Sequence, residues 1–326
     1  MRLFALHGTD TLGAAVAQAL GRTLDPHEER DFEDGEHKAR PLVSVRGHDV
    51  FVMHGLAGAA DASANDRLVK LLFFLATCRE DGAASVTAVV PYLAYARKDR
   101  QTKARDPVTT RYVARMFEAA DIDRLVTMEV HNFAAFQNAY RCETLHLDAR
   151  RLFCAEIARV AGAGHVTIFS PDGGGVKRAQ LLREAYEAAT GNEAGFGFME
   201  KRRSRGVVSG DLFAGDVSGT DVFIVDDMIS TGGTMLRAAE ACRSRGARSV
   251  HVLAAHALFN PGIETLLGSP IVDGIMVTDT IRPAAETAAR FPHARIRTIE
   301  VAPLLGDAIR RLAAGEPLSD LLGFGD

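Results

Sequence analysis

The sequence predicts an α/β protein with two tandem domains, each a mostly parallel sheet flanked by helices. Short β-branched runs alternate with longer helical patterns along the chain, which favours parallel sheets covered on both faces. The pattern restarts after about residue 148, and 326 residues suffice for about two domains. We therefore expect one domain at 1–148 and a second at 149–326, with the last helix able to pack back on the first.

The first half repeats a strand followed by a helix. The run "NDRLVKLLFFLATCRE" places Leu68, Leu71, Leu72 and Leu75 on one helical face, so that face should be buried. The elements expected here are strands at 49–54, 85–92 and 123–130, and helices at 65–80 and 110–120.

The second half shows the same alternation. The turn after the 165–170 strand, "PDGGG", resembles the small-residue turn that follows the 49–54 strand, although any two strand–helix units share that much. Gly246 is expected to end a helix. The elements expected here are helices at 149–161, 176–189 and 233–246, and strands at 165–170, 221–225 and 249–258.

Composition excludes several classes of protein. The chain is 47% hydrophobic and 25% charged, so it can bury a full core, and its net charge of −4 argues against general nucleic-acid binding. No apolar run is long enough to span a bilayer, and the opening "MRLFALHGTD" is unlike a signal peptide. The four cysteines lack metal-ligand spacing, which indicates free thiols. We expect a cytoplasmic protein with no nucleic-acid or membrane partner.

Two adjacent carboxylates stand where a buried strand should end. In the stretch "VFIVDDMISTGGT", Asp226 and Asp227 follow an apolar run. Ligands bind beyond the carboxyl ends of the strands in an open parallel sheet. The pair is therefore expected to accept hydrogen bonds from sugar hydroxyls, with an Asp-rich helix-capping turn as the structural alternative.

The turn behind this pair has the residues of an anion cradle. Gly232 and Gly233 let the backbone approach a ligand, and a helix is expected to start near Gly233. Ser230, Thr231 and Thr234 add hydroxyl donors. A phosphate in this turn and a diol on the aspartates together describe a ribose 5-phosphate.

"VDDMISTGGT" resembles the phosphoribosyl-diphosphate signature of the type I phosphoribosyltransferases. The whole chain resembles the ribose-phosphate diphosphokinase (PRPP synthetase) family, which implies that both domains are phosphoribosyltransferase-like. The other segments that carry the resemblance are "DFEDGEHKARP", "PYLAYARKDR", "TMEVHNF", "FSPDGGG" and "MEKRRSR", together with the closing "HALFNPGIETL" and "VAPLLGDAIRRL".

The resemblance assigns two segments of the first domain to ATP. Arg97 and Lys98 supply cations for the polyphosphate, although such a run alone is usually a solvated basic loop. "DFEDGEHKARP" by itself would pass as a hairpin turn. The residues that the resemblance assigns to adenine there are Phe32, which could stack on the base, and Asp34, Gly35 and Glu36.

The resemblance also assigns metal-binding and catalytic residues. His131 and Asp172 each follow a predicted strand end and lie near Mg²⁺ in the family; singly, each would more often be a structural cap or core residue. Lys201 and Arg203 belong to the family's catalytic loop, whereas a lone charge run usually marks a solvated face.

The implied reaction transfers the diphosphoryl group of MgATP to O1 of ribose 5-phosphate and gives 5-phosphoribosyl 1-diphosphate and AMP, for nucleotide biosynthesis. A homo-oligomer is implied, dimer-based and with a hexamer as one option. Three alternatives stay open: a diphosphokinase with another sugar phosphate or donor, a non-catalytic regulatory paralogue, and a plain phosphoribosyltransferase, against which the first domain argues.

The sequence departs from the family pattern at several places. Lys98 stands where Gln is usual, so a tighter triphosphate site or a different nucleotide preference is open. Ser230 replaces the more usual Asp, which removes a negative charge beside the expected phosphate. "NFAAFQNAYRC" after His131 and "TGNEAGFG" at 190–197 also differ from the family. Assembly, control by phosphate or ADP, and the number of Mg²⁺ ions are left open by the sequence.

Overall fold

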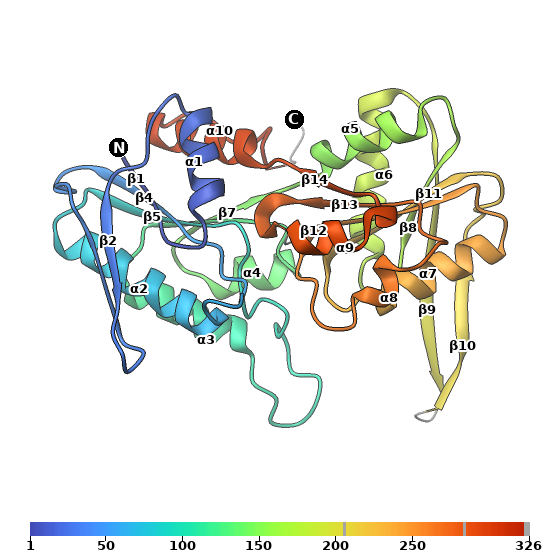
Figure 1. Cartoon of the computed structure of the whole chain (residues 1–326), viewed down its shortest axis with the longest axis horizontal. Helices are drawn as coiled ribbons and strands as arrows, with labels where there is room; N and C mark the ends of the chain where they lie inside the picture. The colour runs from blue at the N-terminus through green and yellow to red at the C-terminus, as the bar shows by residue number, and fades with distance from the viewer. Residues whose placement is uncertain (205–206, 283–284, 323–326) are drawn as a thin grey trace. The chain divides into compact units, whose positions relative to one another are not determined.

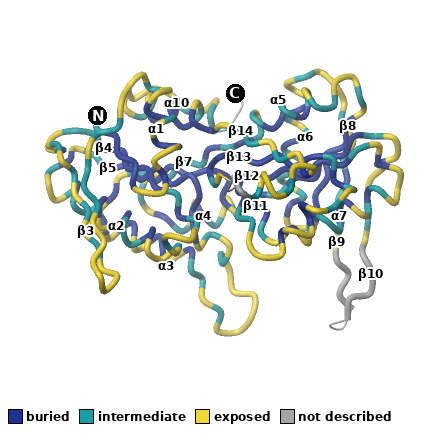
Figure 2. The backbone as a smooth tube through the Cα atoms, in the orientation of Figure 1, coloured by how far each residue is buried: buried dark blue, intermediate teal, exposed yellow. Residues whose placement is uncertain are grey.

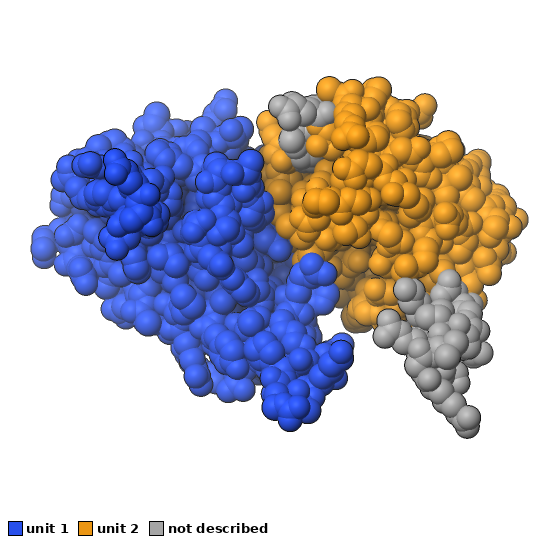
Figure 3. All heavy atoms as spheres, turned by 60° about the horizontal axis from the view of Figure 1, so that its bottom comes forward, with its two compact units in different colours: residues 1–148, 300–326 blue, residues 149–299 orange. Residues whose placement is uncertain are grey.

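The chain divides into two compact units. Unit 1 comprises Met1–Asp148 and Glu300–Asp326, and unit 2 comprises Ala149–Ile299 (Figure 3). The computed structural model describes residues 1–204, 207–282 and 285–322, with the side chains of 201–211 and 285–286 outside that description. No helix in these described ranges is long and apolar enough to cross a membrane.

Unit 1 is built on a five-stranded parallel sheet. Its strands, in spatial order, are β1 (Arg2–Ala5), β4 (Asp49–Met53), β5 (Ser85–Val90), β6 (Arg124–Met128) and β7 (Glu143–Leu147). Its helices are α1 (Asp10–Ala19), α2 (Ala64–Glu80), α3 (Thr109–Ala119), α4 (Phe133–Ala139) and α10 (Ala302–Ala314). Most strand residues are buried because helices cover the sheet, as Figure 2 shows.

Specific local contacts account for the start of α2 and for the packing of α10. Helix α2 begins at a capping box in which the Asp66 amide donates to Ser63 Oγ (3.2 Å) and the Ser63 amide donates to Asp66 Oδ2 (2.8 Å). The predicted leucine face of α2 is buried. Helix α10 packs against α1, where a Cβ on Gly306 would come within 3.1 Å of Ala19 Cβ. The small residue permits this close approach.

A separate antiparallel hairpin lies beside α2 (Figure 1). It consists of β2 (His27–Asp31) and β3 (His37–Pro41). The Lys70 ammonium of α2 lies 2.5 Å from Asp31 Oδ1, and the Phe73 ring stacks on His37 with ring centroids 5.4 Å apart. These contacts hold the last strand pair before the hairpin turn on α2, and the turn at 32–36 continues beyond them.

Unit 2 has a seven-stranded sheet that is parallel except at one edge hairpin. Its strands, in spatial order, are β10 (Val207–Ala214), β9 (Ala194–Ser204), β8 (Val166–Ser170), β11 (Asp221–Ile229), β12 (Ser249–Ala257), β13 (Gly274–Thr278) and β14 (Ile296–Ile299). Its helices are α5 (Arg150–Ala161), α6 (Val176–Thr190), α7 (Gly233–Ser244), α8 (Glu264–Leu267) and α9 (Ala285–Arg290), with two 3₁₀ turns at Asp279–Ile281 and Pro292–Ala294.

One strand differs from its prediction in a way that matters for the site. Strand β11 was expected to end at residue 225, but it runs to Ile229, so Asp226 and Asp227 lie inside the strand. Its pairing with β8 stops at Ile224, whereas its pairing with β12 continues to Ile229. The longer neighbour β12 prolongs the strand, and the aspartates extend beyond the end of β8.

The cysteines and the predicted helix stop agree with expectation. All four cysteines are free thiols, and three of them are buried. Helix α7 ends at Ser244, and Gly246 follows with a φ of +86°, the left-handed conformation that favours glycine.

Candidate functional site

The aspartate pair of β11 shares one cation. Arg178, in the first turn of α6, places Nη1 3.2 Å from Asp226 Oδ1 and 3.8 Å from Asp227 Oδ1. Asp227 is almost fully buried, at 2% side-chain exposure, and Asp226 is 22% exposed. Because β8 and β11 are adjacent parallel strands, the helix that follows β8 brings Arg178 to the same sheet edge as the pair.

This arrangement changes the proton affinity of the pair. Burial, and then the neighbouring Asp227 charge, raise the pKa of Asp226 well above its ordinary value, while Arg178 lowers it only in part. The two adjacent carboxylates offer four acceptor oxygens beside the Arg178 guanidinium. Such a site is suited to a further cation or to hydroxyl donors.

The turn that follows β11 presents backbone donors. Gly232 has a φ of +77° and precedes α7, which begins at Gly233 as predicted. Within the described part of the chain, the amides of 231–234 donate to no backbone acceptor, whereas the Leu236 amide donates to Gly232 O (2.9 Å). Thr231 and Gly233 are exposed. Free amides at a helix N-terminus form a site that favours an anion.

A second loop holds this turn in place. The Asn260 side-chain amide donates to Ser230 Oγ (2.9 Å), and the Asn260 backbone amide donates to Ser230 O (3.1 Å). A Cβ on Gly232 would lie 2.7 Å from Leu266 Cβ and 3.1 Å from Ile263 Cδ1. The turn is therefore packed against buried side chains on one side.

The predicted adenine segment forms the tip of the β2–β3 hairpin. The Phe32 amide donates to Glu36 O (2.8 Å), and the Glu36 amide donates to Asp34 Oδ1 (3.1 Å). Gly35 has a φ of +89°, which the turn requires. The Phe32 ring is 41% exposed, with the Arg30 guanidinium 5.1 Å from its centroid. An aromatic face is thus available for stacking.

Lys98 bonds to a carboxylate of its own loop. Its Nζ donates to Asp106 Oδ2 (2.5 Å) and to Thr102 Oγ1 (3.0 Å). Asp106 Oδ2 also accepts from the amides of Thr102 and Lys103. The hydrogen bond from Lys98 and those from Thr102 hold the pKa of Asp106 far below its ordinary value. Arg97 is exposed beside this loop.

His131 is exposed and lies three residues beyond the end of β6. The next residue, Asn132, caps α4 through its Oδ1 and donates from Nδ2 to Asp99 Oδ2 (2.5 Å). The Val130 amide donates to His146 Nε2 (3.1 Å). These bonds fix the His131 loop and connect it to the basic segment within unit 1.

Asp172 caps the turn before α6. Its Oδ1 accepts from the amides of Gly174 (2.8 Å) and Gly175 (3.1 Å), which corresponds to the structural alternative foreseen for this residue. The side chain is exposed in unit 2. Capping by one oxygen is compatible with a ligand on the other.

Three matches of family models cover most of the chain. Residues 1–120 match the N-terminal domain of ribose phosphate pyrophosphokinase, residues 143–262 a phosphoribosyl transferase domain, and residues 210–323 a phosphoribosyl synthetase-associated domain. The ribose-phosphate pyrophosphokinase of Hyphomonas neptunium is 33% identical over 98% of this chain and 99% of its own. The Vibrio parahaemolyticus enzyme of the same name is also 33% identical, over 98% of each chain.

The chain belongs to the ribose-phosphate pyrophosphokinase family. The crystal structure of phosphoribosylpyrophosphate synthetase from Mycobacterium smegmatis is similar, with a TM-score of 0.84, 29% identity, and coverage of 96% of this chain and 99% of that one. Membership makes this chain a transferase that forms phosphoribosyl diphosphate.

The structure brings several predicted residues to one end of the unit 2 sheet, and it links the His131 loop to the basic segment within unit 1. Asp172 follows β8, the aspartate pair lies within the adjacent strand β11, and the 230–234 turn follows β11. Sequence reasoning missed Arg178 and Asn260, because only the strand order and loop contacts reveal them. The backbones of Lys201 and Arg203 belong to β9, but their side chains lie outside the described residues.

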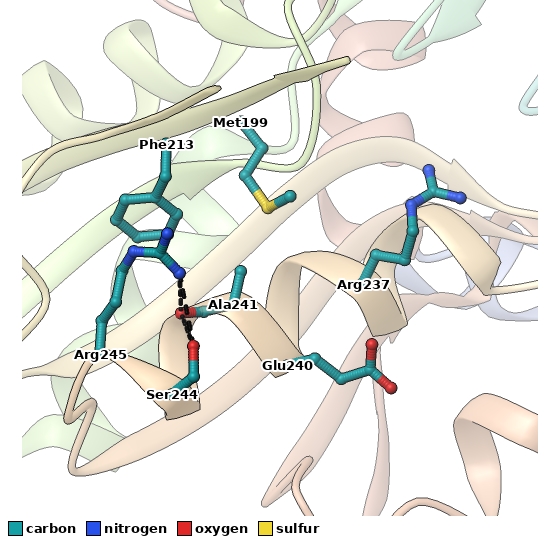
Figure 4. Close-up of a pocket in the computed structure, with 7 residues that line it drawn as sticks. All are labelled: Met199, Phe213, Arg237, Glu240, Ala241, Ser244 and Arg245. Carbon is teal, nitrogen blue, oxygen red and sulfur yellow. Dashed lines mark hydrogen bonds between the residues drawn. The ribbon is translucent and has the colours of Figure 1, made fainter. Parts of the chain in front are cut away.

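A hollow of about 390 Å³ lies on unit 2 between the β9–β10 hairpin and α7 (Figure 4). The Arg245 guanidinium lies 4.0 Å from the Phe213 ring centroid and donates to Ala241 O (3.0 Å). The lining residues are Met199, Phe213, Arg237, Glu240, Ala241, Ser244 and Arg245. Among the predicted site residues whose side chains the structure describes, none lines this hollow.

Proposed function

We propose that this chain transfers the diphosphoryl group of MgATP to O1 of ribose 5-phosphate, forming 5-phosphoribosyl 1-diphosphate and AMP. The proposal rests on the carboxyl end of β11, where two carboxylates precede a turn with free amides. A phosphate suits the amides and a diol suits the carboxylates. Membership of the family is the reason that we assign diphosphoryl transfer to this site.

The sugar phosphate is assigned to unit 2. The 5-phosphate binds the amides of 231–234 and the hydroxyls of Ser230, Thr231 and Thr234. Asp226 and Asp227 accept hydrogen bonds from the ribose hydroxyls, and the Arg178 guanidinium favours the ionised form that accepts them. The O1 hydroxyl is then left to attack the β-phosphorus while the bond from that phosphorus to the α,β-bridging oxygen breaks and AMP leaves.

The nucleotide is assigned to unit 1. Phe32 stacks on adenine, whose polar edge meets Asp34, Gly35 and Glu36 at the hairpin tip. Arg97 and Lys98 neutralise the polyphosphate, and Lys98 exchanges Asp106 for phosphate oxygens when the nucleotide arrives. Lys201 and Arg203 are proposed to offset charge on the transferring group, on the strength of the family resemblance.

Magnesium is the cofactor that we propose, with His131 of unit 1 and Asp172 of unit 2 as candidate ligands, and with Asp226 and Asp227 able to hold a second ion. The oxygen donors of the carboxylates fit a hard cation, and a cation would favour the charged form of Asp226, whose pKa burial and then the Asp227 charge raise. Magnesium, when bound, neutralises and orients the polyphosphate. Action in the cytoplasm and a dimer-based homo-oligomer, with a hexamer as one option, stay predictions.

AMP formation tests the proposal. The purified chain is incubated with MgATP, with and without ribose 5-phosphate, and the sugar product is analysed by mass. We expect AMP only with the sugar, together with a sugar mass gain of one diphosphate. AMP that forms equally without the sugar, or only with another sugar phosphate, would contradict the proposed substrate. A requirement for an added nucleobase would favour a plain phosphoribosyltransferase.

A further inference from the structure

Three metal-ligating side chains meet in unit 1 at a place that the proposed reaction does not use. His7, His27 and Glu29 each offer a ligand atom, and these atoms all lie within 4.8 Å of one another. His27 Nε2 lies 2.8 Å from Glu29 Oε1, and His7 Nδ1 lies 3.7 Å from the same oxygen. Two imidazoles and a carboxylate are ligands typical of divalent transition metals.

The fold, not local sequence, builds this cluster. His27 and Glu29 are two residues apart on β2, so their side chains share one face. The intervening Glu28 faces the other way and pairs with Arg40. His7 follows β1, and its backbone amide donates to Glu29 Oε1 (2.8 Å). The cluster therefore joins the loop after β1 to the base of the hairpin.

Glu29 has an unused acceptor in this cluster. Its side chain is only 5% exposed, and Oε2 is buried without a hydrogen-bond partner among the described residues. A buried carboxylate oxygen in that condition is unusual, since buried polar atoms are nearly always paired. This oxygen supplies a second observation, independent of the spacing of the three residues, that points to a cation.

The surroundings orient the buried ligands and leave one side open. The His27 ring meets the buried rings of Phe4 and Phe74 edge-on, with centroids 6.3 Å and 5.7 Å away. The His7 ring is 65% exposed and free to adjust. Zinc in a tetrahedral site lies about 2.0–2.1 Å from its ligands, which puts the ligands roughly 3.4 Å apart. An inward movement of roughly an ångström by His7, with a separation of the His27–Glu29 pair by about 0.6 Å from its 2.8 Å, meets this need.

We propose that His7, His27 and Glu29 bind a divalent transition-metal ion such as Zn²⁺, at a site distinct from the proposed magnesium site. The two imidazoles discriminate against Mg²⁺, which prefers oxygen ligands and keeps its waters. The ion links the β1–α1 loop to the hairpin whose tip carries Phe32. The expected effect on ATP binding rests on the proposed function, whereas the metal binding itself does not.

Metal titration tests the site without reference to activity. The full-length protein, stripped with a chelator and kept in millimolar Mg²⁺, is titrated with Zn²⁺ by calorimetry and with Co²⁺ by absorption. We expect one Zn²⁺ per chain and a Co²⁺ ligand-field band. His7→Ala should weaken Zn²⁺ binding by about tenfold or more and reduce the band. The exposed His293 of unit 2 gives the matched control, since His293→Ala should leave both unchanged.

Two outcomes would overturn the site. One is the absence of Zn²⁺ binding in the wild-type chain, and the other is equal binding by the wild type and His7→Ala. Because His7 is exposed, its replacement should leave the unfolding midpoint unchanged, and Glu29→Gln provides a second, isosteric variant. A change in the KM for ATP on adding Zn²⁺, seen in the wild type and absent in His7→Ala, would report the link to the hairpin. Metal binding with no such change would leave the site standing and remove only that link.

Discussion

Replacing Gly232 by alanine should disrupt the phosphate turn, and the structure allows the size of the effect to be worked out. Gly232 has a φ of +77°, where a non-glycine residue costs about 1–2 kcal/mol. The new Cβ would lie 2.7 Å from Leu266 Cβ and 2.9 Å from Leu266 Cδ2. Overpacking against a buried side chain adds about 1–3 kcal/mol. The free energy of unfolding should therefore fall by about 2–5 kcal/mol.

The neighbouring Gly233 provides the matched control for stability. An alanine Cβ there meets nothing within 4 Å, and Gly233 lies in the first turn of α7. Gly233→Ala should leave the stability unchanged or raise it by about 0.4–1 kcal/mol. Urea unfolding followed by circular dichroism would measure both variants. Equal midpoints for Gly232→Ala and Gly233→Ala would refute the packing argument, as would a Gly232→Ala midpoint equal to that of the wild type.

Three other predictions follow from the proposed roles. Lys201→Ala should lower kcat about 10²–10³-fold, by analogy with the loss of a preorganised hydrogen-bond donor. The KM for ATP should change little. Steady-state kinetics with an unchanged kcat would show that Lys201 has no role in catalysis. Phe32→Ala should raise the KM for ATP by about tenfold or more through lost stacking, while the exposed Leu42→Ala serves as control; equal KM values would contradict the adenine assignment. Burial and then the Asp227 charge raise the pKa of Asp226 in the folded state. The stabilisation from protonated Asp226 is therefore fully present below the ordinary aspartate pKa of about 4, and it is lost as the pH rises through the raised pKa. The unfolding free energy should thus decrease as the pH rises above about 4, and an equally steep decrease in Asp226→Asn would refute this origin.

The sequence predicted the elements that carry a strong local signal. The leucine face of α2, the start of α7 near Gly233 and the strand leading to Asp226 all follow from periodicity and glycine placement. The end of β11 could not be predicted in the same way, because pairing with β12 extends it past the aspartates. The residue at which β11 ends is set by its pairing with β12 and not by the local sequence of β11.

Contacts between distant residues lay beyond the sequence. Arg178 reaches Asp226 only because β8 and β11 are adjacent, and Lys98 meets Asp106 through a loop closure that no periodicity indicates. The cluster of His7, His27 and Glu29 unites two elements whose proximity depends on the hairpin packing. The roles of the site residues remain predictions that the experiments above address.

The fate of the β-phosphorus of ATP tests the central claim most directly. ATP labelled at that phosphorus is incubated with the chain, magnesium and ribose 5-phosphate, and the products are separated. Diphosphoryl transfer predicts that the label moves to the sugar, with unlabelled AMP as the other product. Label retained in ADP would show transfer of a single phosphoryl group and would contradict the account.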